Sequence, residues 1–137
     1  MDLTAMTDEE CKDHLQDLIK EQPLLFGEFT LASGKTSNYY IDGRLVTLHG
    51  PGAYCLARCI LAILEDYQVE AVGGMALGAD PISGATAAVA ASRGIDLDAF
   101  MVRKQPKGHG TGRQVEGPIL DGAKVAMVED TVTTGGS

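Results

Sequence analysis

The segment VAMVEDTVTTGGS, residues 125–137, combines side chains that could bind a phosphorylated sugar. An apolar run typical of a buried strand leads directly to two carboxylates, Glu129 and Asp130, which can accept hydrogen bonds from sugar hydroxyls or hold a magnesium ion indirectly. Hydroxyls and glycines follow, and glycines let backbone amides turn inward around a phosphate at the start of a helix. An ordinary polar strand-to-helix turn is the simpler interpretation, but the whole pattern favours binding. The residues after the carboxylates are Thr131, Val132, Thr133, Thr134, Gly135, Gly136 and Ser137.

A second candidate is the basic loop, residues 103–117, in which Glu116 is the only acidic residue. On a chain with a net charge of −8, such a concentration of positive charge indicates a polyanionic ligand. The absence of hydrophobic periodicity and the glycines at 108, 110, 112 and 117 predict a mobile loop that closes over that ligand, rather than a solvated linker. Its basic residues are Arg103, Lys104, Lys107, His109 and Arg113.

Two other stretches resemble nucleotide-binding motifs and fail on spacing. SGKTS, residues 33–37, would need a glycine five residues before Gly34, where the chain has Phe29. GHGTG lacks the dinucleotide-binding spacing and does not connect a strand to a helix. Neither an ATPase nor a dehydrogenase is therefore predicted.

The elements that must position these residues alternate along most of the chain. Thr7 and Glu10 form a capping box that predicts a first helix ending before Pro23, and residues 28–44 predict two short strands around a turn at Ser33 to Ser37. A helix from Pro51, a strand at 69–75, a helix at 81–94 and strands at 97–102 and 124–128 follow. The order predicts one α/β domain over residues 1–137, with a helix and small N-terminal hood over about 1–45 and, over about 46–137, a parallel sheet covered by helices on both faces.

Ligands of such sheets bind outside the carboxyl ends of the strands. Three segments fall at these ends of predicted strands: residues 75–81, 103–117 and 129–137. We expect them to form one site.

Composition excludes several classes of protein. The net charge argues against nucleic acid as a partner, and no apolar run reaches the about 18 residues that span a membrane. The acidic N-terminus is unlike a signal peptide, so we expect a soluble, cytoplasmic protein. Three cysteines do not make a disulfide framework, and Cys55 and Cys59 are expected in the core rather than on a metal.

Three motifs together resemble a known family. VAMVEDTVTTGGS resembles the phosphoribosyl-diphosphate signature of the type I phosphoribosyltransferases. FGEFTLASGKTSNYYIDGR and VRKQPKGHGTGRQVEGP are similar, more specifically, to the orotate phosphoribosyltransferase family. The similarity runs from about Phe26 to Ser137, and it implies the type I phosphoribosyltransferase fold.

The resemblance implies a reaction. Orotate N1 attacks C1 of 5-phosphoribosyl 1-diphosphate, magnesium pyrophosphate leaves, and orotidine 5′-monophosphate forms, a step of de novo pyrimidine biosynthesis. Magnesium would be held mainly through the diphosphate, with no direct protein ligand. The family also implies a homodimer in which the 103–117 loop is shared across the interface.

The resemblance also implies a role for each candidate residue. Four loop residues would close over the diphosphate: Arg103, Lys104, Lys107 and His109. Among them, Lys107 would stabilise the leaving pyrophosphate most strongly. Glu129 and Asp130 would bind the ribose, with Asp130 stabilising positive charge on the ring, which makes Lys107 and Asp130 the candidate catalytic residues. Residues 131–137 would bind the 5′-phosphate, with Thr133 also near the orotate.

The chain departs from the family pattern in two ways. Some members carry lysine where this chain has Ala32 and Gly78, so contacts to the diphosphate would be fewer or supplied by the amides of residues 76–79. Members also continue past TTGGS with a helix, a strand and a segment that encloses the base. We therefore expect a truncated or incompletely represented form of a longer transferase, with Val125, Met127 or their neighbours exposed.

Two alternatives stay open. Another purine or pyrimidine phosphoribosyltransferase would share the fold and the terminal motif, but the hood sequence and the basic loop favour orotate. A regulator that senses phosphoribosyl diphosphate without turnover would normally carry a basic surface for nucleic acid, whereas this chain is acidic outside the loop.

Overall fold

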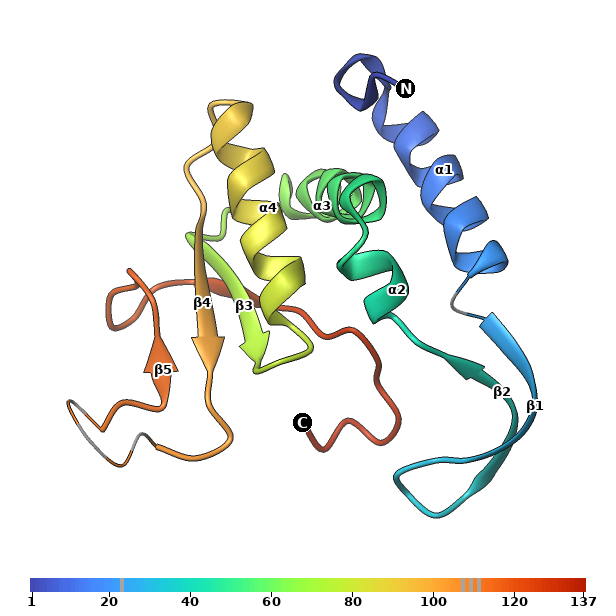
Figure 1. Cartoon of the computed structure of the whole chain (residues 1–137). Helices are drawn as coiled ribbons and strands as arrows, with labels where there is room; N and C mark the ends of the chain where they lie inside the picture. Colours follow the sequence, from blue (N-terminus) through green and yellow to red (C-terminus); the bar gives the residue numbers. More distant parts are fainter. Residues whose placement is uncertain (23, 107, 109, 111) are drawn as a thin grey trace.

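The computed structural model describes residues 1–22, 24–106, 108, 110 and 112–137. Helices pack beside a small sheet, and a two-stranded hairpin projects from the helical side (Figure 1). In chain order the elements are η1 (Leu3–Ala5), α1 (Asp8–Glu21), β1 (Leu24–Thr30), β2 (Thr36–Ile41), α2 (Arg44–Thr47), α3 (Gly50–Leu64), β3 (Ala71–Met75), α4 (Asp80–Ser92), β4 (Asp98–Val102), β5 (Val115–Glu116) and β6 (Val125–Met127).

The first helix, α1, begins as its sequence predicts. The Glu10 backbone N–H donates to Thr7 Oγ1 at 3.2 Å, and the Thr7 N–H donates to Glu10 Oε2 at 2.7 Å. This capping box satisfies amides that have no partner within the helix. The prediction of a capped N-terminal helix is confirmed.

The hairpin that follows has its turn earlier than predicted. β1 and β2 pair antiparallel, and the pairing already includes Thr30 with Thr36. Gly34 has a φ of +81°, and the Leu31 N–H donates to the Lys35 carbonyl at 2.8 Å, which closes the turn at residues 31–35. The predicted turn at Ser33 to Ser37 is therefore wrong by about two residues, because the left-handed glycine reverses the chain.

The main sheet has the strand order β5-β4-β3-β6. β3 pairs parallel with β4 and with β6, so the α/β fold with a mainly parallel core is confirmed. β5 pairs antiparallel with β4 and lies inside the 103–117 segment, for which no regular structure was predicted. A strand of two residues is too short to show an alternating hydrophobic pattern in the sequence. β5 can therefore be recognised only from its pairing with β4 in the structure.

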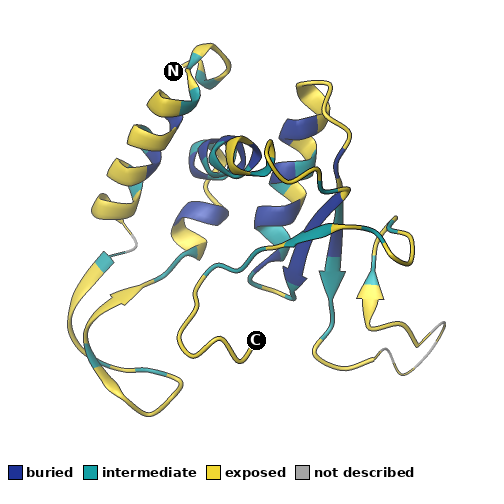
Figure 2. Ribbon diagram, turned by 180° about the vertical axis from the view of Figure 1, so that it is seen from behind, coloured by how far each residue is buried: buried dark blue, intermediate teal, exposed yellow. Residues whose placement is uncertain are grey.

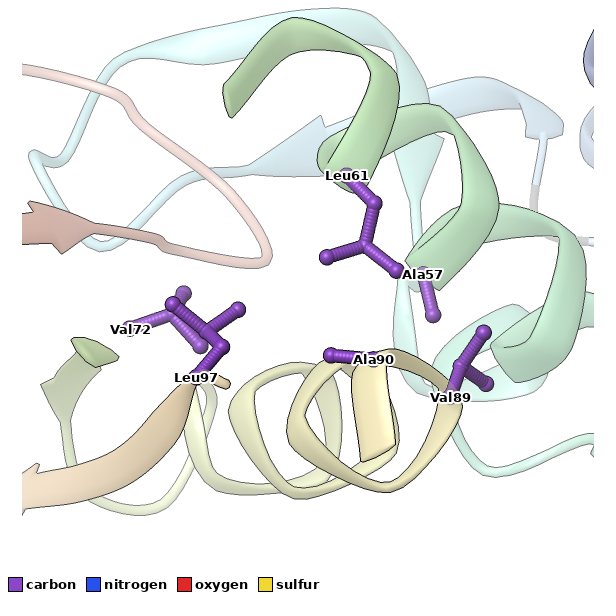
Figure 3. Packing of buried hydrophobic residues seen from close by; sticks show 6 residues of the cluster. All are labelled: Ala57, Leu61, Val72, Val89, Ala90 and Leu97. Carbon is purple, nitrogen blue, oxygen red and sulfur yellow. The ribbon is translucent and has the colours of Figure 1, made fainter. Parts of the chain in front are cut away.

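The core lies between the sheet and two helices. Figure 3 shows Val72 of β3 and Leu97 beside β4 facing Ala57 and Leu61 of α3, with Val89 and Ala90 of α4 completing the cluster. α4 packs directly on β3 and β4, while α3 packs on α4 and α1. Burial follows this arrangement, since the inner faces of the helices and β3 are buried and the hairpin is exposed (Figure 2).

The surface of β6 is less well covered. Met127 is 62% exposed, and Val125 is half-buried. The expectation that Val125, Met127 or their neighbours would be exposed is confirmed by Met127.

The cysteines lie in a second apolar cluster between α1 and α3. Cys11 and Cys55 are fully buried, and Cys59 is half-buried. Burial, reinforced by contact with Cys11, raises the pKa of Cys55 to about 12, so it stays a neutral thiol. Cys55 therefore packs in the core, as predicted.

Among the residues with described structure, no helix is both long and apolar enough to cross a membrane.

Candidate active site

The ends of three parallel strands bring the predicted segments to one edge of the sheet. β3 leads into the 76–79 connection to α4, β4 leads to Lys104, and β6 leads to Glu129 and Asp130. The C-terminal segment, residues 128–137, then runs between this edge and the β1–β2 hairpin (Figure 1). The prediction that strand ends would gather these segments holds for the described residues.

The acidic pair, Glu129 and Asp130, is half-buried against the loop that follows β3. A Cβ atom built on Gly78 would lie 2.5 Å from Asp130 Oδ1 and 2.8 Å from Glu129 Oε1. Real Cβ atoms essentially never come this close to another heavy atom, so a side chain at position 78 would displace the ends of both carboxylate side chains from the positions seen here. Any side chain larger than that of glycine would require the loop or the carboxylates to move.

The electrostatics of the pair favour a proton or another cation. Burial raises the pKa of Glu129, and the side-chain hydrogen bond with Asp130 and the negative charge of Asp130 raise it further. The hydrogen bond from the Asp130 backbone N–H and the charge of Lys104 act in the opposite direction. The two adjacent carboxylates would therefore stabilise any positive charge that develops beside them.

Residues 131–137 form an irregular, exposed segment. The Thr131 N–H donates to Asp130 Oδ1 at 2.9 Å, and the Gly136 N–H donates to Thr134 Oγ1 at 3.4 Å. Gly135 has a φ of +79°, which bends the segment back. Residues 131–137 contain no helix, so the helix start suggested from the sequence is not formed within them.

Two adjoining cavities flank the acidic pair. The loop cavity, of about 650 Å³, lies against residues 127–137 and includes Ala32 and Ser33 of the hairpin turn. The hood cavity, of about 720 Å³, lies between the end of β2, the loop after β3, Lys104 and the acidic pair. Met75, Glu129, Thr131 and Ser137 line both, so the two cavities share one wall.

The predicted substrate-binding residues divide between these cavities. Asp130 lines the hood cavity, and Glu129 and Thr131 line both. The remaining members of the C-terminal set line the loop cavity: Val132, Thr133, Thr134, Gly135, Gly136 and Ser137, the last of which also reaches the hood cavity.

The basic loop contributes unequally to the site. Lys104 lines the hood cavity, whereas Arg103 is turned to β5, where its Nε donates to Glu116 Oε1 at 3.2 Å. Arg103 lines neither cavity, because the short β4–β5 pairing holds it beside Glu116. Lys107 and His109 lie outside the described residues.

The backbone amides suggested as substitutes for the missing lysines are only partly available. The Ala76 N–H donates to the Val102 carbonyl at 2.9 Å, and the Ala79 N–H donates to the Met75 carbonyl at 3.2 Å. Only Leu77 and Gly78 of this loop have amides without a recorded acceptor among the described residues.

Sequence reasoning missed three hood residues that line the hood cavity: Tyr40, Asp42 and Arg44. Gly43 lies between the last two, and a Cβ there would be 3.4 Å from both Cβ and O of Asp130. The available signal was an acidic and a basic residue, two positions apart, at the end of the segment predicted to form the second strand.

Comparison with known proteins places the chain in a family, although no family model matches it. It is 52% identical over 126 residues to orotate phosphoribosyltransferase of Rhodopirellula baltica, covering 88% of this chain and 65% of the relative. It is 45% identical over 132 residues to orotate phosphoribosyltransferase of Streptomyces coelicolor, covering 96% of this chain and 71% of the relative. The chain thus spans about two thirds of the length of these curated relatives.

Solved structures agree with the sequence comparison. Orotate phosphoribosyltransferase of Mycobacterium tuberculosis in complex with Fe(III) dicitrate matches with a TM-score of 0.79 at 38% identity, covering 93% of this chain and 71% of that one. The same enzyme in complex with 5-phospho-alpha-D-ribosyl 1-diphosphate matches with a TM-score of 0.72 at 34% identity, covering 91% of this chain and 67% of that one. The chain therefore belongs to the orotate phosphoribosyltransferase family.

Proposed function

We propose that this protein transfers the phosphoribosyl group of 5-phosphoribosyl 1-diphosphate to orotate, giving orotidine 5′-monophosphate and pyrophosphate in pyrimidine biosynthesis. The observation that carries the proposal is the acidic pair between two joined cavities, one lined by hydroxyls and glycines and the other by Arg44 and Lys104. This arrangement offers a place for a sugar, its 5′-phosphate and a diphosphate side by side.

In this proposal the residues of the C-terminal segment bind the phosphoribosyl group. Residues 131–137 donate hydroxyls and amides to the 5′-phosphate, and Thr133 also faces the orotate. Glu129 and Asp130 accept hydrogen bonds from the ribose hydroxyls. Asp130 stabilises the positive charge that develops on the ribose as the bond from C1 to the diphosphate breaks, because a fixed carboxylate favours that charge more than it favours the ground state.

The basic loop serves the leaving group. Lys104 faces the diphosphate from the end of β4, and Lys107 stabilises the pyrophosphate as it departs, with Arg103 and His109 closing over it. Closure excludes water from the reacting carbon and strengthens each charge interaction within the site. Arg103 would first have to break its ion pair with Glu116. This pair is weak, because the Arg103 side chain is 40% exposed and the Glu116 side chain is 35% exposed.

Magnesium fits this site as a companion of the diphosphate. The hood cavity is lined by Asp42, Asp80, Glu129 and Asp130, so an anionic ligand enters more readily with a cation beside it. Bound magnesium would neutralise charge on the diphosphate and improve it as a leaving group.

We also propose that the protein works in the cytoplasm as a homodimer that shares the 103–117 loop. The three free cysteines of the described chain suit a reducing compartment.

The activity is tested by following orotate absorbance with 5-phosphoribosyl 1-diphosphate and magnesium, with adenine, hypoxanthine and uracil as control bases. We expect turnover with orotate alone. Turnover with another base would favour a different phosphoribosyltransferase, and ligand binding without turnover of any base would favour the sensing regulator.

Lys107→Ala tests the loop. We expect the turnover number to fall by about two to three orders of magnitude, since the lost charge meets the transition state. The melting temperature should stay unchanged, because an exposed loop contributes little to stability. Unchanged turnover with normal melting would remove Lys107 from the mechanism.

A further inference from the structure

Arg44 is held in a defined orientation at the end of the hood. Its Nε donates to Asp42 Oδ1 at 2.9 Å, and its Nη2 donates to Asp42 Oδ2 at 3.1 Å. The Arg44 backbone N–H donates to the same carboxylate at 3.2 Å. Two-pronged pairing fixes the plane of the guanidinium, and the side chain remains 63% exposed, so its outer N–H groups can meet a ligand.

The Asp42–Arg44 turn lies directly against the acidic pair. Gly43 approaches Asp130 closely, as the contact of 3.4 Å from its ideal Cβ position shows. The hydrogen bond to Asp42 raises the pKa of Arg44, with a smaller contribution from the negative charge of Asp130. Arg44 and Asp130 also line the same hood cavity.

The hood cavity needs positive charge to accept a diphosphate. Among its described lining residues, Arg44 and Lys104 are the lysines and arginines, against four carboxylates. Position 78, beside Asp130 and Glu129, is a glycine and contributes no charge. Arg44 lines the same cavity from the hood, so it can supply the charge that position 78 does not.

We propose that Arg44 binds the diphosphate of the substrate directly and, with Lys104, supplies the positive charge of the hood cavity. The inference rests on the proposed function. The planar guanidinium can donate two parallel hydrogen bonds to phosphate oxygens, and Asp42 positions it to do so.

The test measures how tightly the chain binds each of the two parts of the substrate, the diphosphate and the ribose 5-phosphate. Magnesium pyrophosphate and ribose 5-phosphate are each titrated into the full chain by calorimetry, for the wild type, Arg44→Ala, Arg44→Gln and Lys124→Ala. Lys124 is a lysine at the opposite end of the β6 strand, so it controls for the loss of one positive charge. Because a hydrogen bond to a charged group is lost, we expect both Arg44 variants to bind pyrophosphate about 10- to 100-fold more weakly, with ribose 5-phosphate binding and the control unchanged.

A double variant distinguishes two possible effects of Arg44→Ala: the loss of the arginine contact with the ligand, and repulsion of the ligand by the unpaired carboxylate of Asp42. If Arg44→Ala weakens binding only because Asp42 then repels the ligand, Asp42→Asn with Arg44→Ala restores the affinity, which would overturn the proposal. We expect the double variant to stay weak. Pyrophosphate binding that survives Arg44→Ala overturns only the role of Arg44, whereas a wild-type chain that binds neither compound contradicts the proposed function as well.

Discussion

At the scale of single residues, the site depends on how closely two carboxylates can approach a loop. Gly78 allows Glu129 and Asp130 to lie against the β3–α4 connection, and the Asp130 N–H donates back to Glu129 Oε1 at 3.0 Å. Crowding negative charge in a half-buried position costs stability in the absence of a ligand. Such a cost is typical of residues kept for binding, since any cation or developing positive charge relieves it.

Glu129→Gln should reveal this cost through the pH dependence of unfolding. The folded-state pKa of Glu129 lies above its ordinary value near 4.5, so between the two values the folded chain binds more protons than the unfolded chain. The contribution of Glu129 to stability therefore falls as pH rises through that window and stays low above it. The glutamine side chain of the variant cannot ionise, so we expect the variant to be more stable than the wild type in urea at pH 7, with the difference shrinking as pH falls toward 4.5.

The exposed Glu28 provides a control, because Glu28→Gln removes a carboxylate outside this environment. A Glu129→Gln variant less stable than the wild type at pH 7 would mean that the carboxylate stabilises the fold.

At the scale of elements, a buried arginine connects the N-terminal helix to the core. Arg58 of α3 is 7% exposed and donates from Nε to Asp8 Oδ1 at 2.7 Å, at the start of α1. Its Nη2 donates to the Met6 carbonyl at 3.1 Å, and its Nη1 donates to Tyr54 Oη at 3.3 Å. Because α1 leads directly into β1, this arginine also anchors the hairpin that delivers Arg44 to the site.

Arg58→Ala should lower the free energy of unfolding by about 2–3 kcal/mol. Breaking a fully buried ion pair costs about 3–5 kcal/mol, and the value here is lower because Asp8 is 40% exposed. Urea unfolding gives the measurement, with Lys12→Ala on α1, the helix that carries the partner Asp8, as the control. Lys12 pairs with Glu9 at 3.3 Å on the surface, so its loss should have no measurable effect, and equal effects of the two changes would contradict the anchoring role.

At the scale of the whole molecule, the described site is open and draws its residues from both ends of the chain. Arg44 and Ala32 come from the hood, while Glu129 and Ser137 come from the C-terminal segment. The loop and hood cavities are both accessible, so another element must cover the bound substrate during the reaction. The 103–117 loop of a second subunit is the cover that we propose.

Complementation between two inactive variants tests that arrangement. Lys107→Ala and Asp130→Asn chains, each nearly inactive, should regain part of the activity when mixed, because one site of the mixed dimer combines an intact loop with an intact acidic pair. The mixture is assayed for orotate turnover after exchange of subunits is verified by native mass spectrometry. Mixed dimers without activity would place the loop and the acidic pair of each site on the same chain.

The sequence by itself was sufficient for features that depend on neighbours a few residues apart. The capping box at Thr7 and Glu10, the alternation of helices and strands and the position of Glu129 and Asp130 after β6 all follow from local patterns. Strand ends gather at one edge of a parallel sheet whatever the details of packing, so the location of the site could also be predicted.

Tertiary structure alone decided which distant residues meet there. Residues 44 and 130, or 78 and 129, are far apart in the chain, and no local pattern encodes their contact. The β4–β5 pairing that holds Arg103 beside Glu116 is likewise decided by tertiary structure, because residues 115–116 form a strand only by pairing with β4. Local propensity selects the elements, whereas the close approach of backbones and charges arises only when those elements pack.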